Sequence, residues 1–503
     1  MKKLFAFIAL FITVHCSAQS FYKFTSPAKI QTSISAIPTY DGGFITSNMV
    51  KFDGIGNTQW SKYYLYLQST RICQAYDSSY AYTGSTNSYG VGTPSPIFVR
   101  TSKNGSFLGA KAYISSNATI GVSIKQTVDS GYIIAVNDSN NIILIKTNKL
   151  GDTTWVKKYT TTNGINATDI ITTKDTGYVI TGVSKSATQR KTLLYKVNST
   201  GNTVWAKDLS SSTTNENESG VHLAVSTGGY ILTSQIEDRI ASIYKLDTNG
   251  TVVSVNLIST AGSVFRTQSI YSIGTNDGGT ATVGSVFPNP ADTINSLLFA
   301  VKTNAAGTVN WCKAYGNANT SLILSCIKQN SNSSYSLLGH TKLPTSEDGI
   351  VFINTDSNGK LNCQDTLFAT SSGSTTPNLS NINITTSNHT LTVHNFAPTD
   401  TAGTISKIIC FPVSVNNKNE ILTSTIYPNP NNGSFTIKVV TNHSATSGII
   451  EISNIQGQIL QRKQLIIHNG VAEYETKEVL CPGTYYLSIQ AGNERSVKIF
   501  TVQ

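Results

Sequence analysis

The stretch LIKTNKLGDTTWVKKY (144–159) is matched 50 residues later by LYKVNSTGNTVWAKDL (194–209). Both place a lysine, an asparagine, a glycine and a tryptophan at the same offsets. All four tryptophans of the chain stand four residues after such a glycine, and a spacing of 46 to 57 residues is typical of repeat arrays. The aligned glycines of seven copies are Gly56, Gly105, Gly151, Gly201, Gly250, Gly307 and Gly359.

A second signature precedes each copy: Asp, Ser or Gly residues lead into an aromatic residue, as in DTGYVITG (175–182). This is turn chemistry feeding a strand. The second strand of a unit is apolar at successive positions, which predicts that both of its faces are covered. The fourth alternates and ends in lysines, which predicts an outer edge. The strands of one unit are expected at 122–128, 132–136, 142–146 and 153–159.

Four-stranded antiparallel units of about 50 residues cannot bury two faces alone, whereas radial stacking buries both. The sequence therefore predicts an all-β fold with a seven-bladed β-propeller over residues 20–412; a β-helix has shorter rungs and lacks paired hairpin turns. The repeat glycine supplies a positive φ, the tryptophan packs between blades, and the lysine five residues earlier extends to solvent. Residues 370–412 lie outside the seven copies and either add a closing strand or wrap the rim.

The N-terminus is typical of an export signal. Lys2 and Lys3 precede the apolar run LFAFIALFITV (4–14), and small residues follow at 16–20. The 11 apolar residues are too few to cross a bilayer, which takes about 20. We therefore expect a signal peptide over residues 1–19.

The charge of the chain bears on its binding partners, and its cysteines bear on disulfide formation. Only 13% of the residues are charged, the net charge is +10, and no dense Lys/Arg run occurs, so a nucleic-acid partner is not expected. Cys73 and Cys326 lie in apolar stretches and are predicted to be buried free thiols. Cys363 and Cys410 bracket the end of the repeat region and are the candidate disulfide, since an exported chain can oxidise.

The repeat resembles propeller repeats of secreted Bacteroidota proteins, and its hairpin is similar to that of quinoprotein repeats, a likeness that carries no catalytic residue. The C-terminal stretch from IYPNPNNGSFTIKV (426–439) to RSVKIFTVQ (495–503) resembles a type A C-terminal sorting domain of the type IX secretion system. The residues that match this domain are Tyr427, Pro428, Asn429, Pro430, Asn454, Gly457, Pro482, Gly483 and Tyr485.

Alternating strands in this C-terminal stretch predict a small Ig-like β-sandwich at 425–503, joined by a linker at 413–424. A generic Ig-like module is the alternative, but the terminal position and the YPNP opening favour the sorting domain. The resemblance implies contact with the type IX secretion machinery and a protein that is secreted or held on the outer cell surface. It also implies that the cargo is either released or attached to outer-membrane lipopolysaccharide.

No motif for a nucleophile elbow, zinc protease, P-loop or EF-hand occurs, and the histidines are scattered, so no catalytic, cofactor or metal residue is predicted. The first hypothesis is a non-enzymatic binding or adhesion protein for a glycan or a protein. The alternative is a propeller enzyme, either a quinoprotein-like dehydrogenase or a polysaccharide hydrolase or lyase.

The links between the second and third strands of the units differ widely in length, and they are long at 84–96, 284–295 and 339–348. Variable loops on a rigid scaffold are where recognition usually occurs. Tyr89, Phe287 and His340 are therefore the predicted ligand face. The alternative is that these loops are tolerated insertions without a partner.

Overall fold

The computed structural model describes most of the chain, and every regular element in the described part is a β-strand. None of it is a helix long and apolar enough to cross a membrane. The chain divides into two compact units, Met1–Val413 and Ser414–Gln503. The described residues are 21–27, 35–64, 68–88, 93–115, 117–186, 188–210, 216–237, 240–260, 264–287, 296–315, 321–342, 348–361, 366–367, 370–373, 378–389, 391–395, 400–402, 405–409, 422–431, 434–441, 447–454, 459–476, 480, 483–491 and 494–502.

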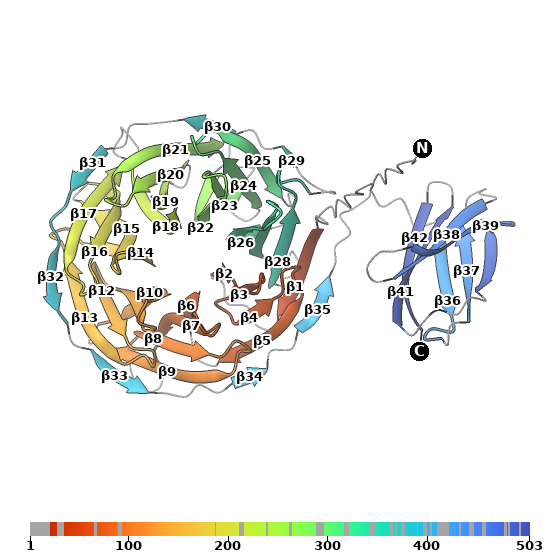
Figure 1. Ribbon diagram of the computed structural model, residues 1–503, viewed down its shortest axis with the longest axis horizontal. Helices are drawn as coiled ribbons and strands as arrows, with labels where there is room; N and C mark the ends of the chain where they lie inside the picture. The colour runs from red at the N-terminus through yellow and green to blue at the C-terminus, as the bar shows by residue number, and fades with distance from the viewer. Residues whose placement is uncertain are drawn as a thin grey trace, which may run out of the picture. The chain divides into compact units, whose positions relative to one another are not determined.

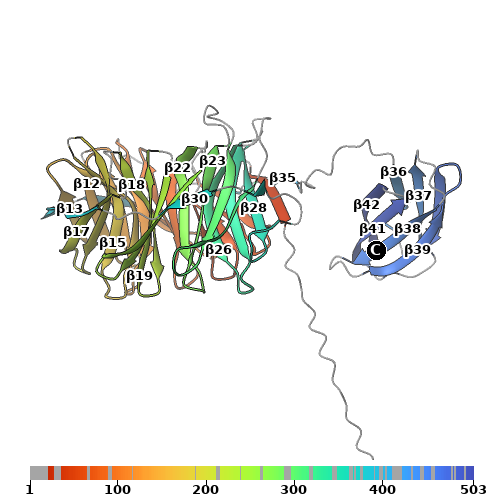
Figure 2. The same ribbon diagram turned by 90° about the horizontal axis from the view of Figure 1, so that it is seen from above.

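The described part of the first unit forms seven antiparallel sheets of five strands each, arranged in a ring (Figure 1). Figure 2 shows that the strands run between the two faces of this ring. Each innermost strand contacts the innermost strands of the sheets on either side, and the last contacts the first. We number the sheets 1 to 7 by these strands: β2 (Ala36–Pro38), β6 (Gln68–Gln74), β10 (Thr119–Gln126), β14 (Ile165–Thr172), β18 (Glu218–Ser226), β22 (Val264–Gly274) and β26 (Ser321–Gln329).

The second and third strands of each sheet lie between neighbouring sheets and are mostly buried on both faces, as their continuous apolar runs predict. The second strands are β3 (Phe44–Thr46), β7 (Tyr80–Thr86), β11 (Tyr132–Asp138), β15 (Tyr178–Lys185), β19 (Gly229–Ile236), β23 (Thr280–Phe287) and β27 (Tyr335–Lys342). The third strands are β4 (Val50–Phe52), β8 (Ser95–Thr101), β12 (Asn141–Thr147), β16 (Arg190–Val197), β20 (Ile240–Asp247), β24 (Leu297–Thr303) and β28 (Asp348–Thr355).

The fourth strand of sheet 7 comes from the other end of the unit. β1 (Phe21–Pro27) pairs antiparallel with β28, so the N-terminal strand completes the sheet that the last copy begins. Sheets 1 to 6 use the strand that directly follows their own turn. These are β5 (Thr58–Tyr64), β9 (Phe107–Ile114), β13 (Thr153–Thr160), β17 (Thr203–Ser210), β21 (Val252–Thr260) and β25 (Val309–Tyr315).

A series of short strands circles the outside of the ring and adds a fifth strand to every sheet (Figure 1). We call strands β29 to β35 the outer belt. It visits sheets 6, 5, 4, 3, 2, 1 and 7 in that order, so of the two predicted roles for residues 370–412 the segment wraps the rim. The belt strands are β29 (Thr366–Leu367), β30 (Thr370–Gly373), β31 (Asn378–Asn381), β32 (Thr385–Asn388), β33 (Thr392–Asn395), β34 (Asp400–Ala402) and β35 (Ile405–Ile409).

The belt corrects the prediction that the fourth strand is an outer edge. In β13, for example, Lys157 and Lys158 are paired in register with Asn388 and Ser387 of β32. These two lysines do not mark a free edge but form polar contacts with neighbouring strands. Lys157 Nζ donates to Asn202 Oδ1 of sheet 4 at 2.6 Å. Lys158 Nζ forms an ion pair of 2.6 Å with Asp138 of its own sheet.

Apolar residues in the links between belt strands also pack against the cores that neighbouring sheets share. Ile382 and Ile384 pack against the core shared by sheets 3 and 4, and Leu391 packs against the core shared by sheets 2 and 3. The Ile382 amide donates to the Ala206 carbonyl at 3.3 Å. The belt therefore contributes hydrophobic contacts as well as backbone pairing.

The seven aligned glycines all lie in the turn after the third strand with φ between 69° and 89°, which confirms the predicted positive φ; in sheets 1 to 6 this turn leads into the fourth strand. Each is covered by a side chain of the preceding sheet. A Cβ on Gly105, Gly201, Gly250 or Gly359 would lie 2.6 to 2.9 Å from the ring of the preceding sheet's tryptophan. The residues that take the place of tryptophan over Gly56, Gly151 and Gly307 are Phe352, Phe98 and Asn256.

Hydrogen bonds reinforce this contact between sheets. The indole of Trp60 donates to the Lys103 carbonyl at 3.2 Å, two residues before the next sheet's glycine. The Tyr159 hydroxyl donates to the carbonyl of Gly201 at 2.8 Å. The prediction that the tryptophan packs between neighbouring units is therefore confirmed.

The repeat lysine does not extend to solvent, so that prediction is wrong. Lys51, Lys146, Lys196 and Lys302 are only 1 to 7% exposed. Each ammonium forms an ion pair of 2.6 to 2.8 Å with the aspartate of the turn between the first two strands of its own sheet. A lysine buried this far needs a partner charge, and the second sequence signature supplies it.

Sheet 2 has Arg100 in place of the lysine, paired with Asp77 at 2.5 Å, and the two remaining sheets lack such a pair. Sheet 7 has neither charge: Asn354 stands at the lysine position and accepts from the Ser336 hydroxyl at 3.0 Å. In sheet 5 the turn lacks the acid, and Lys245 donates to the carbonyls of Gly278 and Ala305 in sheet 6 at 2.9 and 2.6 Å. In a sheet whose first turn lacks the aspartate, the lysine is therefore either replaced, as in sheet 7, or hydrogen-bonded to carbonyls of the next sheet, as in sheet 5.

The described cysteines of the ring agree with the prediction of free thiols. Cys73 and Cys326 are buried free thiols, and Cys312 is a third buried cysteine that forms no disulfide. Burial raises the pKa of the Cys73 thiol to about 12, which keeps it protonated and unreactive. Cys363 and Cys410 lie outside the described residues, and their disulfide stays a prediction.

The second unit contains two antiparallel sheets that share one hydrophobic core. Buried and exposed residues alternate along β37 and β41, so one face of each sheet supplies the core. The three-stranded sheet is β36 (Leu422–Tyr427), β37 (Phe435–Thr441) and β40 (Val471–Thr476). The four-stranded sheet is β39 (Ile459–Ile466), β38 (Ser447–Asn454), β41 (Gly483–Ala491) and β42 (Glu494–Val502).

The contact between sheets can be tested at Gly250. Its φ is 69°, and a Cβ there would lie 2.7 Å from the Trp205 ring, so Gly250→Ala combines backbone strain with a clash. We expect a loss of about 2 to 4 kcal/mol of unfolding free energy in urea titrations. Gly228→Ala is the matched control, because φ is 84° but nothing lies within 4 Å, and it should cost only about 1 to 2 kcal/mol. Equal losses for the two variants would contradict the close contact.

The lysine–aspartate pairs predict loss of stability in acid. Burial alone raises the pKa of Asp277, but hydrogen bonds from Lys302, Thr275 and a backbone amide outweigh this and lower it to about 2. A pKa below the unfolded value of about 3.9 stabilises the fold above pH 4, and this contribution is lost as the pH falls toward 2. Urea midpoints at pH 5 and pH 2.5 should therefore fall less for Asp277→Asn/Lys302→Asn, which copies sheet 7, than for the wild type. A parallel decline of both proteins would contradict the assignment.

Candidate functional site

The innermost strands of sheets 2 to 7 shift register at corresponding points, by one inserted residue in five of them and by a longer insertion in β22. A bulge inserts one residue, bends the strand and re-aims the side chain that follows. The inner edge of the ring is therefore irregular in the same way in sheets 2 to 5 and in sheet 7. The register shifts lie at Ser69/Arg71, Gly121/Ser123, Ala167/Asp169, Gly220/His222, Arg266/Tyr271 and Leu324/Cys326.

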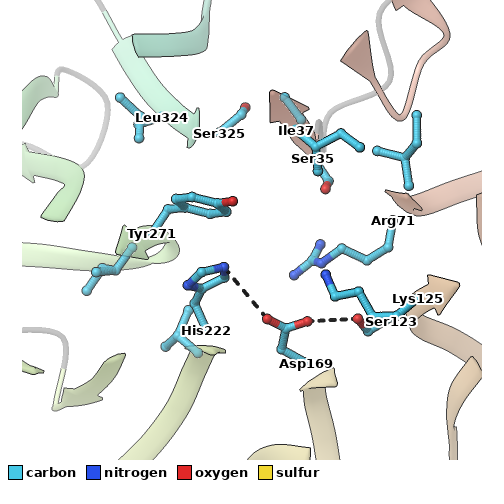
Figure 3. Close-up of a pocket in the computed structure, with 14 residues that line it drawn as sticks. Ser35, Ile37, Arg71, Ser123, Lys125, Asp169, His222, Tyr271, Leu324 and Ser325 are labelled. Atoms are coloured by element: carbon cyan, nitrogen blue, oxygen red, sulfur yellow. Dashed lines mark hydrogen bonds and ion pairs between the residues drawn. The ribbon is translucent and has the colours of Figure 1, made fainter. Parts of the chain in front are cut away.

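The residues directly after five of these register shifts, those of sheets 2 to 6, meet at the centre of the ring, where they line a cavity of about 80 Å³ (Figure 3). This space accommodates several waters or a small ligand, since one water needs about 10 to 15 Å³ in this measure. Lys125, two residues beyond Ser123 on the same strand, also lines it. The lining side chains at the post-bulge position are Arg71, Ser123, Asp169, His222 and Tyr271.

Asp169 is the most firmly held group in the cavity. It is 4% exposed. It accepts from Ser123 Oγ at 2.7 Å and from the amides of Ile170 and Leu223 at 2.9 and 3.1 Å. Burial alone raises the pKa of Asp169, but the charges of Lys125 and Arg71, the hydrogen bond from the Leu223 amide and, in acid, the protonated His222 ring together hold this pKa below its ordinary value. Asp169 is therefore a fixed negative charge at neutral pH.

His222 is uncharged at neutral pH. Its ring packs against Tyr271 with centroids 3.9 Å apart, and its Nε2 lies 3.8 Å from Asp169 Oδ2. Burial lowers the pKa of His222 to about 4, and this outweighs the opposing effect of Asp169. The Ser272 amide donates to Nδ1 at 3.4 Å, so the proton of the neutral ring is at Nε2.

These bonds do not make a nucleophile. A Ser–His–Asp relay needs the hydroxyl bonded to the imidazole, whereas Ser123 donates to Asp169. The cavity is instead lined by charged groups. Arg71 and Lys125 are cations, and Asp169 is the one carboxylate among the described lining residues. His222 is neutral. The described lining therefore has a formal charge of +1.

This site was not predicted from the sequence, although the sequence contains a signal for it. The cavity residue stands nine positions before the first residue of the second strand in most copies, as Asp169 does before Tyr178 and Arg71 before Tyr80. In sheet 5, where the turn is one residue shorter, His222 stands eight positions before Tyr230, the residue of β19 that corresponds to Tyr178. The residue after it is usually apolar, as Ile170 is.

The predicted ligand-face residues lie elsewhere. Phe287 ends β23 and is 5% exposed, and His340 is partly buried within β27. Tyr89 lies outside the described residues, as do the central parts of the three long loops. This ligand face stays a prediction.

In the second unit the YPNP segment is tied to the end of the chain. Asn429 Oδ1 accepts from the Thr501 amide at 3.0 Å, which fixes the segment against β42. Tyr485 stacks on Phe500 with centroids 5.6 Å apart. Asn454 and Tyr485 are paired in register, and Gly483 begins β41. The matched residues Gly457 and Pro482 lie outside the described residues.

Residues 425–503 match the family described as the secretion system C-terminal sorting domain. This domain marks proteins that pass through the type IX secretion machinery, so the chain is a cargo that is secreted or attached to the cell surface. No curated protein matches the chain. Within the described ranges, no group of three or more His, Cys, Asp or Glu residues is placed to hold a metal ion.

The bond from Thr501 to Asn429 predicts the effect of Asn429→Ala. The Thr501 amide loses its acceptor, and the end of β42 should open more readily, at a cost of about 1 kcal/mol. Hydrogen exchange of a C-terminal peptide covering residues 495–503 should accelerate about fivefold. Thr425→Ala, on an exposed position of β36, serves as the control and should leave the exchange unchanged. Unaltered exchange in Asn429→Ala would remove this role for the asparagine.

Proposed function

We propose that this protein is a non-enzymatic binding or adhesion protein of the cell exterior, with a glycan or protein ligand. Its ring, residues 20–412, is a seven-bladed β-propeller preceded by a signal peptide at 1–19. A linker at 413–424 leads to an Ig-like β-sandwich at 425–503, which is the type A sorting domain. Once outside, the protein is released or attached to lipopolysaccharide.

The observation that carries the proposal is the sorting-domain match at residues 425–503, which directs the rest of the chain to the exterior. Support for the propeller comes from seven sheets of like strand order whose innermost strands contact one another around the ring. Support for the sandwich comes from the core that the two sheets of the second unit share.

Binding rather than catalysis is favoured by the chemistry of the central cavity. The hydroxyl of Ser123 and both oxygens of Asp169 are engaged within the fold. His222 is neutral at the pH at which a general acid would have to be charged. A rigid ring with links of unequal length is suited to recognition, and Tyr89, Phe287 and His340 stay the residues proposed for a macromolecular ligand.

Deleting residues 425–503 tests the export step. In a bacterium with a type IX system we expect the intact chain in the medium or on the outer surface, and the truncated chain in the periplasm. Protease resistance of the truncated ring is the control, because it separates a sorting defect from misfolding. Delivery of the truncated protein to the medium in wild-type amounts would overturn the sorting role of this domain.

A further inference from the structure

A pocket lies between sheets 4 and 5, on the face of the ring that carries the turns between the first two strands of each sheet. Its volume is about 320 Å³, at the lower end of the range of about 300 to 1,000 Å³ that is usual for small-molecule sites. We call it the junction pocket. Its walls come from the first turns of the two sheets, at 172–175 and 225–230, and from the turn after β20.

Three other junctions between sheets are spanned by a glutamine. In sheets 2, 3 and 7 a glutamine is paired in register with the tyrosine that begins the second strand. Its side-chain oxygen accepts from an amide in the first turn of the preceding sheet. The distances are 2.8 Å for Gln74, 2.6 Å for Gln126 and 2.9 Å for Gln329. The side chain and its hydrogen bond therefore fill the space between the two turns.

Sheet 5 has no glutamine at this position. The residue paired with Tyr230 is Val225, which has no acceptor and is 53% exposed. The first turn of sheet 5 is also one residue shorter than that of the other sheets, and a Cβ on Gly228 would have nothing within 4 Å. The space that glutamine occupies at the other three junctions is therefore open at this one.

The polar groups of the junction pocket include both donors and acceptors. Lys196 Nζ lies 2.6 Å from Asp175 Oδ2, and the Asp175 side chain is 57% exposed. Burial alone raises the pKa of Asp175, but hydrogen bonds from Lys196 and Thr173 and the charge of Lys196 lower it, so this carboxylate is ionised at neutral pH. Thr248 and Asn249, on the turn after β20, add an exposed hydroxyl and an exposed amide.

We propose that the junction pocket binds one sugar ring of a glycan. A sugar hydroxyl both donates and accepts, so neighbouring hydroxyls can bond to Lys196 and to Asp175 together, whereas the carboxylate would repel a phosphate. Val225 is the one aliphatic side chain among the described lining residues. It suits the C–H face of a ring, but one valine is too little to anchor an apolar peptide side chain.

This inference rests on the binding role proposed above and narrows the ligand to a glycan. The site is separate from the predicted ligand face, because the long links at 84–96, 284–295 and 339–348 join the second and third strands at their other ends. Lys174, Thr248 and Asn249 are exposed at the rim of the pocket, so the remainder of a longer glycan would extend into solvent.

The test is ligand-observed NMR of the purified full chain at pH 7. The probes are the methyl pyranosides of glucose, galactose, mannose, fucose, N-acetylglucosamine and glucuronic acid, each titrated through the millimolar range. We expect saturable binding of at least one probe with a Kd of about 1 mM, which is usual for a ligand of about a dozen heavy atoms. Preference for the glucuronide would identify an acidic polysaccharide as the source of the sugar, and preference for another probe would identify a neutral glycan.

Two variants should close the pocket without removing a contact. Val225→Gln copies Gln126, and Gly228→Asn places a side chain in the open space at a φ of 84°, which asparagine tolerates. Each should weaken binding of the responsive probe at least tenfold. The matched controls are Val253→Gln, at an exposed valine of β21, and Gly278→Asn, at the same turn position in sheet 6. Neither lines the pocket, and both should bind as the wild type does.

A third variant removes one polar group at the rim. Asn249→Ala should weaken binding about fivefold, the usual effect of losing one hydrogen bond. Asn358→Ala is its control, because Asn358 is exposed at the same turn position in sheet 7 and does not line the pocket. It should leave the affinity unchanged.

The outcomes separate this site from the proposed function. No saturable binding of any of the six probes, or equal binding by Val225→Gln and Val253→Gln, would overturn the junction pocket. Loss of binding in a triple alanine variant of Tyr89, Phe287 and His340 instead would overturn the pocket and support the binding role. Hydrolysis of a probe by the wild type but not by Val225→Gln would support the pocket and overturn the non-enzymatic role.

Discussion

The ring depends on the approach of a large side chain to the turn glycine of the next sheet. Because glycine has no Cβ, the tryptophan rings reach positions where a Cβ would be only 2.6 to 2.9 Å away. The same glycine provides the positive φ that reverses the chain into its fourth strand. One residue therefore meets two requirements, and the Tyr159 hydroxyl bonded to Gly201 adds a third contact at the same place.

The packing of the tryptophan between sheets could be predicted from the sequence because tryptophan and turn glycine recur at a constant offset within a copy, as Gly201 and Trp205 do, although Trp205 itself covers Gly250 of the next sheet. The burial of the lysine could not. Its aspartate partner stands in the other signature, at a separation that varies from 10 residues (Asp41 to Lys51) to 25 (Asp277 to Lys302). A pair at variable spacing leaves no periodic signal, and an isolated lysine at the end of a strand is typically exposed.

The belt and the cavity could not be predicted from the sequence, for two different reasons. The belt strands β29 to β35 have two to five residues, too few to display an alternation, and Ser, Thr and Asn are frequent in them. Their partners lie far away in the chain, as β13 does from β32. The cavity residues, such as Asp169 and His222, hold the same position in different sheets but differ in chemistry. An alignment of the repeats reveals residues that the copies have in common, whereas this site is formed by residues that differ from copy to copy.

Ring closure joins the two ends of the first unit. β1 pairs with β28 on one side and with the last belt strand, β35, on the other. The 321 positions from Pro27 to Asp348 make this closure cost about 5 kcal/mol of chain entropy. A secreted chain emerges N-terminus first, so β1 has to wait for residues 348–409 before it can pair. The belt pairs with the fourth strand of every sheet, so the hydrogen bonds and contacts that offset this entropy cost are distributed around the whole ring. The ring is therefore complete only when the segment that precedes the sorting domain in the chain has paired.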